Sequence, residues 1–214
     1  MAEPIQLLAT GVAIRRGGRD VLADVELALG PGVFELRGAN GSGKSTLLRA
    51  LAGVGAIHRR RVAIAGHDLA RHPVAAKRRL GYMPETAELF PSLTPRELLT
   101  TFAAVRGVTD DGTADYAALT RSAALDLRIA TLSAGQRRKL ALVAAIQGAP
   151  TVWLLDEPTD TLDAAALDYL RAAIVRHRCS GGTVLIATHR PNEQDLAVDA
   201  VLDVAAGRVT GRAG

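Results

Sequence analysis

The chain has 214 residues, of which 48% are hydrophobic, and its formal net charge is +4. This length predicts one domain over residues 1–214, and the lone Cys179 excludes a disulfide framework or a cysteine-based zinc cluster. No stretch approaches the roughly 20 apolar residues of a membrane-spanning helix, and residues 1–14 lack the basic-then-apolar pattern of a signal peptide. We therefore expect a soluble, cytosolic protein.

The positive charge does not by itself indicate a nucleic-acid partner. The basic runs at His58 to Arg61 and Lys77 to Arg79 are short, and no aromatic residues are interleaved with them to stack on bases. Nucleic-acid binding is therefore not expected.

The first third of the chain predicts two strands and then a glycine-rich loop. Val25 to Leu29 alternates apolar and polar residues before Gly30-Pro31-Gly32, and Val33 to Leu36 forms the next strand. A helical pattern of apolar residues begins at Leu47. Between strand and helix lies Gly38-Ala39-Asn40-Gly41-Ser42-Gly43-Lys44-Ser45-Thr46.

This loop has the P-loop pattern of a glycine, four residues and then Gly-Lys-Ser, in the strand-to-helix setting that the pattern requires. Its backbone N–H groups would face phosphate oxygens. Lys44 would reach the β- and γ-phosphates of a nucleotide, and the hydroxyl of Ser45 would bind Mg²⁺. An accidental glycine turn is the alternative.

The middle of the chain predicts helices. Thr94-Pro95-Arg96-Glu97 is a capping box that opens a helix to about Arg106, and Asp110-Asp111-Gly112 interrupts the pattern before a second helical stretch to about Ala124. Residues of about 85 to 132 therefore read as a small helical insertion in an α/β core.

Strands and helices alternate in the last third, which predicts a mostly parallel sheet. The strands are Thr151 to Leu155, Thr183 to Ala187 and Ala200 to Val204, with a helix over Asp163 to Arg178. The first of these strands ends in Asp156 and Glu157, the form of a Walker B segment. Asp156 would hold Mg²⁺, and Glu157 would act as a general base towards the attacking water.

The segment Leu132-Ser133-Ala134-Gly135-Gln136, before Walker B, resembles the signature of the ABC ATPase family. Ser133 would also cap the helix that follows it. The resemblance extends over nearly the whole chain, because a Gln-loop-like segment at Gly81 to Glu85, a D-loop at Thr161-Leu162-Asp163 and a switch histidine at His189 stand in the family's order.

The resemblance implies a P-loop NTPase fold: a RecA-like core with an N-terminal antiparallel β part and a helical subdomain. It implies ATP and Mg²⁺ as cofactors and a γ-phosphate contact for His189. It also implies that Ser133, Ala134, Gly135, Gln136 and Asp163 contact nucleotide across an interface between two chains. One P-loop and one signature cannot complete a site alone, so a homodimer or heterodimer is expected.

Three positions depart from the family's usual pattern. Glu85 replaces a glutamine that touches Mg²⁺, and a carboxylate can still bind that ion. Ala134 replaces the first signature glycine. Before Val21, where an aromatic ring usually stacks on adenine, the chain offers Arg15 and Arg16, which leaves the preference between ATP and GTP open.

The segments around Glu85 and the signature are similar to those of exporter ATPases, including the haem exporters of cytochrome c maturation. This similarity implies an ATP-hydrolysing transporter subunit on the inner face of the cell membrane, with a separate transmembrane permease. Leu89-Phe90-Pro91 would help to receive the permease or would simply pack within the helical subdomain. The alternatives are a soluble ABC ATPase that acts on a protein partner, as in cofactor assembly, and a P-loop kinase, which the signature disfavours.

Overall fold

The computed structural model describes residues 4–16, 19–54, 61–86, 88–120, 124–189 and 196–213. The basic run at His58 to Arg61 lies outside these ranges except for Arg61. The strands are β1 (Leu7–Arg16), β2 (Arg19–Leu29), β3 (Gly32–Arg37), β4 (Arg61–Ile64), β5 (His67–Asp68), β6 (Leu80–Met83), β7 (Val152–Asp156), β8 (Thr183–Ala187), β9 (Ala200–Ala205) and β10 (Arg208–Ala213). The α-helices are α1 (Lys44–Leu51), α2 (Pro73–Arg78), α3 (Pro95–Arg106), α4 (Thr113–Thr120), α5 (Ala134–Ile146) and α6 (Ala164–Cys179).

The strands form two sheets. A four-stranded antiparallel sheet has the order β2-β1-β4-β5, and a six-stranded sheet has the order β10-β9-β3-β8-β7-β6. In the larger sheet all neighbours are parallel except β10, which pairs antiparallel with β9. This confirms the expected α/β fold, with an antiparallel part at the N-terminus and a mixed RecA-like sheet.

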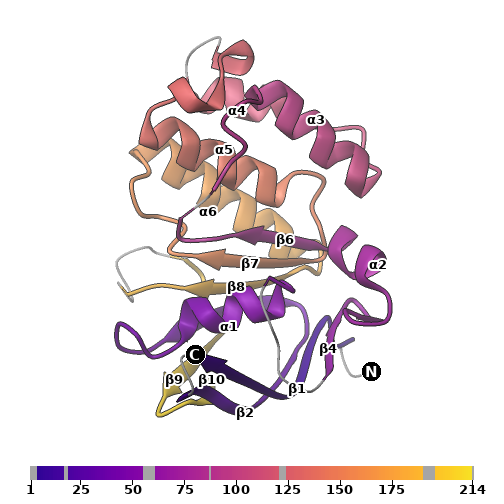
Figure 1. Ribbon diagram of the computed structural model, residues 1–214, viewed down its shortest axis with the longest axis vertical. Helices are drawn as coiled ribbons and strands as arrows, with labels where there is room; N and C mark the ends of the chain where they lie inside the picture. The colour runs from indigo at the N-terminus through magenta and orange to yellow at the C-terminus, as the bar shows by residue number, and fades with distance from the viewer. Residues whose placement is uncertain are drawn as a thin grey trace.

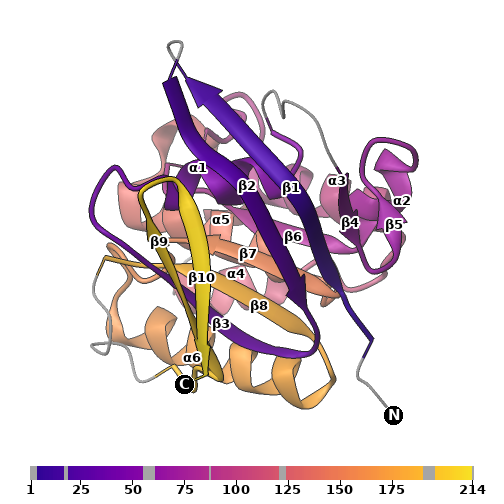
Figure 2. The ribbon, with the colours of Figure 1, turned by 90° about the horizontal axis from the view of Figure 1, so that it is seen from below.

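Helix α1 packs between the two sheets and lies behind β1 and β2 in Figure 2. Its Leu47, Leu48 and Leu51 are fully buried against both sheets. Burying a leucine side chain contributes about 1.5 to 3 kcal/mol, so these three residues fix the helix firmly on the sheet. Since α1 begins at Lys44, this packing also fixes the P-loop.

The strand β7 shows how the two faces of the larger sheet are divided. Val152 and Leu154 belong to the core around α1, whereas Trp153 and Leu155 belong to the core around α5 and α6. Because side chains alternate along a strand, a continuous apolar run is what a strand covered on both faces requires. Strand β7 lies in register between β6 and β8, and its last residue, Asp156, pairs with Ala187 of β8.

Helices α3 and α4 lie at the end of the molecule opposite the antiparallel sheet (Figure 1). They share a core with α5, built from Leu98, Tyr116, Leu140 and other buried residues. Both halves of the predicted capping box of α3 are present.

The helices of the middle segment agree with the sequence expectation where the structure describes them. The left-handed Gly107, with φ of 73°, ends α3 at Arg106, as predicted, and the break at Asp110 to Gly112 separates α3 from α4. The described part of α4 runs from Thr113 to Thr120, and a 3₁₀ turn begins at Ala124. Within the described residues, no helix is both long and apolar enough to cross a membrane.

Candidate nucleotide-binding site

The loop between β3 and α1 carries the residues predicted to bind phosphate. Gly43, the residue before α1, has a φ of 107°, a left-handed conformation that glycine adopts without steric cost. A side chain at Gly38 would collide with the carbonyl oxygen of Val204. No side chain caps the N-terminus of α1, so the backbone N–H groups there are available to an anion.

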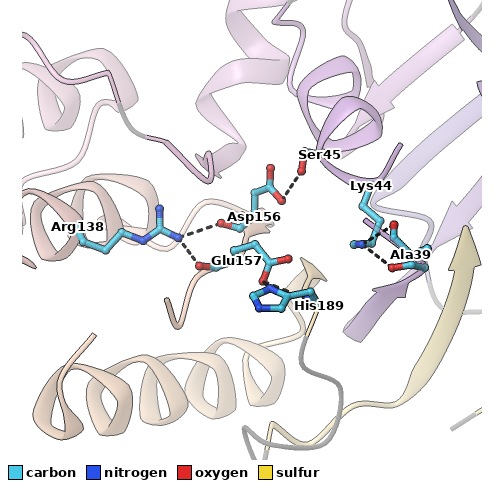
Figure 3. Close-up of polar contacts among 8 residues, drawn as sticks. Ala39, Lys44, Ser45, Arg138, Asp156, Glu157 and His189 are labelled. Atoms are coloured by element: carbon cyan, nitrogen blue, oxygen red, sulfur yellow. Dashed lines mark hydrogen bonds and ion pairs between the residues drawn. The ribbon is translucent and has the colours of Figure 1, made fainter. Parts of the chain in front are cut away.

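Lys44 places a buried cation at this helix end. The residue is only 6% exposed, and its Nζ donates to the carbonyl oxygens of Gly38 at 2.6 Å and Ala39 at 3.4 Å (Figure 3). A cation at the positive end of a helix dipole is unfavourable, and no acidic residue lies in the first turn of α1. The combination favours a bound anion such as a phosphate group.

Ser45 and Asp156 meet beside the loop. The Ser45 hydroxyl donates to Oδ1 of Asp156 at 3.0 Å (Figure 3). Burial raises the pKa of Asp156 to about 6, and the hydrogen bond from Ser45 opposes this rise. The exposed Glu85, just beyond β6, is close enough for its carboxylate to raise that pKa further. Hydroxyl and carboxylate oxygens are the ligands that Mg²⁺ takes, so these three residues fit the predicted metal site.

Glu157 and His189 form a pair at the ends of β7 and β8. Oε2 of Glu157 lies 2.9 Å from Nδ1 of His189 and accepts the His189 backbone N–H at 3.2 Å. Glu157 has a φ of 47°, and its own N–H donates to the Ala187 carbonyl at 2.8 Å. Residues held in such sparsely populated conformations cluster at functional sites.

Most of the predicted site residues line one cavity of about 530 Å³, a size typical of small-molecule sites, and Asp156 lies beside it, bonded to the lining Ser45. Predicted phosphate, metal and catalytic residues thus converge on it from several parts of the chain. The lining residues are Val21, Asn40, Gly41, Gly43, Lys44, Ser45, Thr46, Glu85, Glu157 and His189.

The signature and D-loop residues are not among the described residues that line this cavity. Ser133 caps α5, as predicted, and the structure adds a reciprocal contact with Gln136 that completes a capping box. Asp163 caps α6 by accepting the Ala166 N–H at 3.0 Å, and it pairs with Lys139 at 2.7 Å. Ala134 and Gly135 form the first turn of α5.

The place expected for adenine has no aromatic ring among the described lining residues. Val21 lines the cavity beside Gly43, and sequence reasoning did not identify it. Arg15 instead pairs with Asp20 at 2.8 Å on the surface, and its side chain is 59% exposed. Nothing is described for the side chain of Arg16.

A second residue that the sequence did not reveal is Arg138, in the second turn of α5. Its guanidinium reaches the backbone of the Glu85 and Glu157 segments. An arginine in a helix gives no sequence signal of such a contact, because only the folded chain brings these segments together.

Comparison with known proteins identifies the family. The family described as ABC transporter matches residues 22–160. The chain belongs to this family. Its members are ATPases that hydrolyse ATP for transport, and the matched range contains the P-loop, the signature segment and the pair Asp156 and Glu157.

The names of similar proteins point to different cellular roles. The cytochrome c biogenesis ATP-binding export protein CcmA of Sphingopyxis alaskensis is 39% identical over 189 residues, which cover 86% of this chain and 90% of that protein. The human phospholipid-transporting ATPase ABCA7 is 36% identical over 188 residues, which cover 84% of this chain but 9% of that protein. The chain is therefore similar both to a protein named for export in cytochrome c biogenesis and to one named for phospholipid transport.

A solved structure titled "Structure of ATP binding subunit of ABC transporter" superposes with a TM-score of 0.83 at 28% identity. The match covers 97% of this chain and 90% of that one. The fold of this chain is therefore that of an ATP-binding subunit of an ABC transporter.

Proposed function

We propose that the chain is the ATP-hydrolysing subunit of an ABC exporter and works on the inner face of the cell membrane with a separate permease. The observation that carries this proposal is that Lys44, Ser45 and Glu157 line one cavity, with Asp156 bonded to Ser45 beside it, in a chain that has no membrane-crossing helix among its described residues. The export direction is supported by the similarity to proteins named for export. We expect the permease to determine the cargo.

The residues at and beside the cavity would divide the work of binding and hydrolysing ATP. The loop from Gly38 to Thr46 binds the phosphates of ATP, with Lys44 as the cation that neutralises them. Ser45, Asp156 and Glu85 would hold Mg²⁺, which shields phosphate charge when bound. Glu157 accepts a proton from the attacking water, and His189 orients that carboxylate through the contact at 2.9 Å.

The exporter proposal predicts a specific contact with a permease. Phe90, in the loop before α3, is 58% exposed, unusually so for a large apolar side chain. We expect the tagged wild-type chain, purified from detergent-solubilised membranes, to retain a protein with about six apolar spans, and Phe90→Asp to lose it. Val175→Asp, which changes an equally exposed residue on α6, is the control.

Basal ATP hydrolysis should be the same in the wild type, Phe90→Asp and Val175→Asp, since neither Phe90 nor Val175 lines the cavity. Retention of a soluble partner protein, with no membrane protein, would instead favour the alternative of an ABC ATPase in cofactor assembly.

A dimer is proposed because Ser133 and its neighbours stand apart from the cavity of their own chain. Ser133 begins α5, whose N-terminal donors suit a phosphate group of nucleotide bound to another chain. We expect Glu157→Gln with Mg-ATP to sediment as a dimer in analytical ultracentrifugation, and as a monomer without nucleotide.

The matched control is the double variant Lys44→Ala with Glu157→Gln, which should stay monomeric because it lacks the phosphate-binding cation. A monomer at every concentration of the single variant would contradict self-pairing and leave a heterodimer with a similar subunit.

A further inference from the structure

Arg138 joins two catalytic segments that are distant in the sequence. It is 7% exposed and lies in the second turn of α5. Its Nη1 donates to the carbonyl oxygens of Pro84 at 2.9 Å and Glu85 at 2.6 Å. Its Nη2 donates to the carbonyls of Asp156, at 3.1 Å, and Glu157 (Figure 3). One side chain thus bonds the backbone next to β6 and the backbone next to β7.

The surroundings of Arg138 are strongly acidic. Burial lowers the pKa of its guanidinium, and four carboxylates act against that effect, those of Asp160, Asp156, Glu85 and Glu157. A buried cation is costly unless opposite charge balances it and hydrogen bonds satisfy its donors. Here the four carboxylates supply the opposite charge and four backbone carbonyls accept from Nη1 and Nη2, while the buried Nε has no hydrogen-bond partner among the described residues. The planar fork of arginine can reach several acceptors at once, which the point charge of lysine cannot do with the same geometry.

The guanidinium of Arg138 bonds to backbone carbonyls and does not contribute to the wall of the cavity. Arg138 is not among the described residues that line the cavity, whereas the side chains of Glu85 and Glu157 are. Glu157 is fixed from two sides: its N–H donates to Ala187, and its carbonyl accepts from Arg138. Losing the second contact would let the left-handed backbone at Glu157 relax and move its carboxylate.

Arg138 is also close to the part of the chain proposed to meet the second subunit. It follows Ser133, the N-cap of α5, by just over one helical turn. A rigid helix therefore connects the signature to the backbone of the proposed base.

We propose that Arg138 is a positioning residue for ATP hydrolysis, which holds the Glu85 and Glu157 segments in their working geometry and ties both to the signature helix. The inference rests on the proposed function, because it assumes that the cavity hydrolyses ATP. It gives Arg138 an effect on turnover that is separate from any effect on ATP affinity.

Arg106 provides a matched control. It lies in the last turn of α3, and its guanidinium donates to the carbonyls of Ala144, Ala145 and Gln147 at the opposite end of α5. Burial lowers the pKa of this side chain to about 10, so it remains a cation at neutral pH. Arg106 and Arg138 therefore do similar structural work at the two ends of one helix.

The experiment compares Arg138→Gln, Arg138→Lys and Arg106→Gln with the wild-type chain, below the thermal unfolding temperature of each. We expect Arg138→Gln to lower kcat by roughly 10- to 10²-fold, the effect of a small misplacement of reacting groups, with the Kd for ATP changed less than about threefold. The Mg²⁺ concentration for half-maximal rate should rise, because Glu85 and Asp156 shift as well. The kcat of Arg138→Lys should lie between those of the wild-type chain and Arg138→Gln.

Arg106→Gln should lower thermal stability while leaving kcat and Mg²⁺ dependence within about threefold of the wild type. Equal losses of kcat in Arg138→Gln and Arg106→Gln, or a loss in ATP affinity alone, would overturn the proposal. If Arg138→Gln does not fold, an unchanged kcat in Arg138→Lys would overturn it instead. A wild-type chain that does not hydrolyse ATP would contradict the proposed function itself. This outcome differs from the ones that overturn the role of Arg138, because those require an active wild type.

Discussion

Glu157→Gln should bind ATP with unchanged affinity and hydrolyse it about 10²- to 10⁴-fold more slowly, the loss expected for removing a general base. The amide keeps the shape of the side chain, but it accepts a proton far less readily than the carboxylate. It can still accept the His189 backbone N–H, which the carboxylate accepts at 3.2 Å, so the local backbone should be preserved.

Steady-state phosphate release and equilibrium ATP binding by the purified variant measure the two effects. Glu26→Gln is the matched control, because it makes the same chemical change at an exposed position on β2 and should leave turnover unchanged. If Glu157→Gln turns over within a few-fold of the wild type, the carboxylate only holds the His189 segment in place and another residue activates the water.

Lys44→Ala should remove most nucleotide binding, with a Kd for ATP increased by about 10- to 10²-fold or more. The reason is that phosphates at the N-terminus of α1 would lose their nearest buried cation, and a charge-assisted hydrogen bond contributes roughly 1.5 to 3 kcal/mol. Titration calorimetry with Mg-ATP provides the measurement.

Lys77→Ala serves as the control for Lys44→Ala, since Lys77 is an exposed lysine on α2 and its loss removes the same charge. The folded state of Lys44→Ala should survive, because within the described part of the chain the ammonium group bonds to the loop carbonyls of Gly38 and Ala39 and Lys44 belongs to none of the hydrophobic clusters. An unchanged affinity in a folded Lys44→Ala protein would refute the phosphate-binding role of the loop.

The sequence alone determined the elements around the site, because their signals are local. The glycine pattern requires the backbone conformation seen at Gly43. The short apolar run ending at Asp156 predicts a buried strand with an acid at its carboxyl end, which the structure confirms as β7. The caps at Thr94 and Ser133 were likewise readable, since a capping box spans four residues and is stabilised within them. Family resemblance supplied the order of these motifs.

The tertiary structure decided which residues meet, because those contacts depend on chain segments far apart in the sequence. It brought Val21 to the cavity in place of an aromatic ring and left Arg15 on the surface with Asp20. It also separated Ser133 and Asp163 from the cavity of their own chain. The contacts of Arg138 arise because α5 packs across the ends of β6 and β7, and no local pattern encodes that packing. A guanidinium can satisfy its donors in solvent or on a distant backbone equally well, so only the folded chain determines its role.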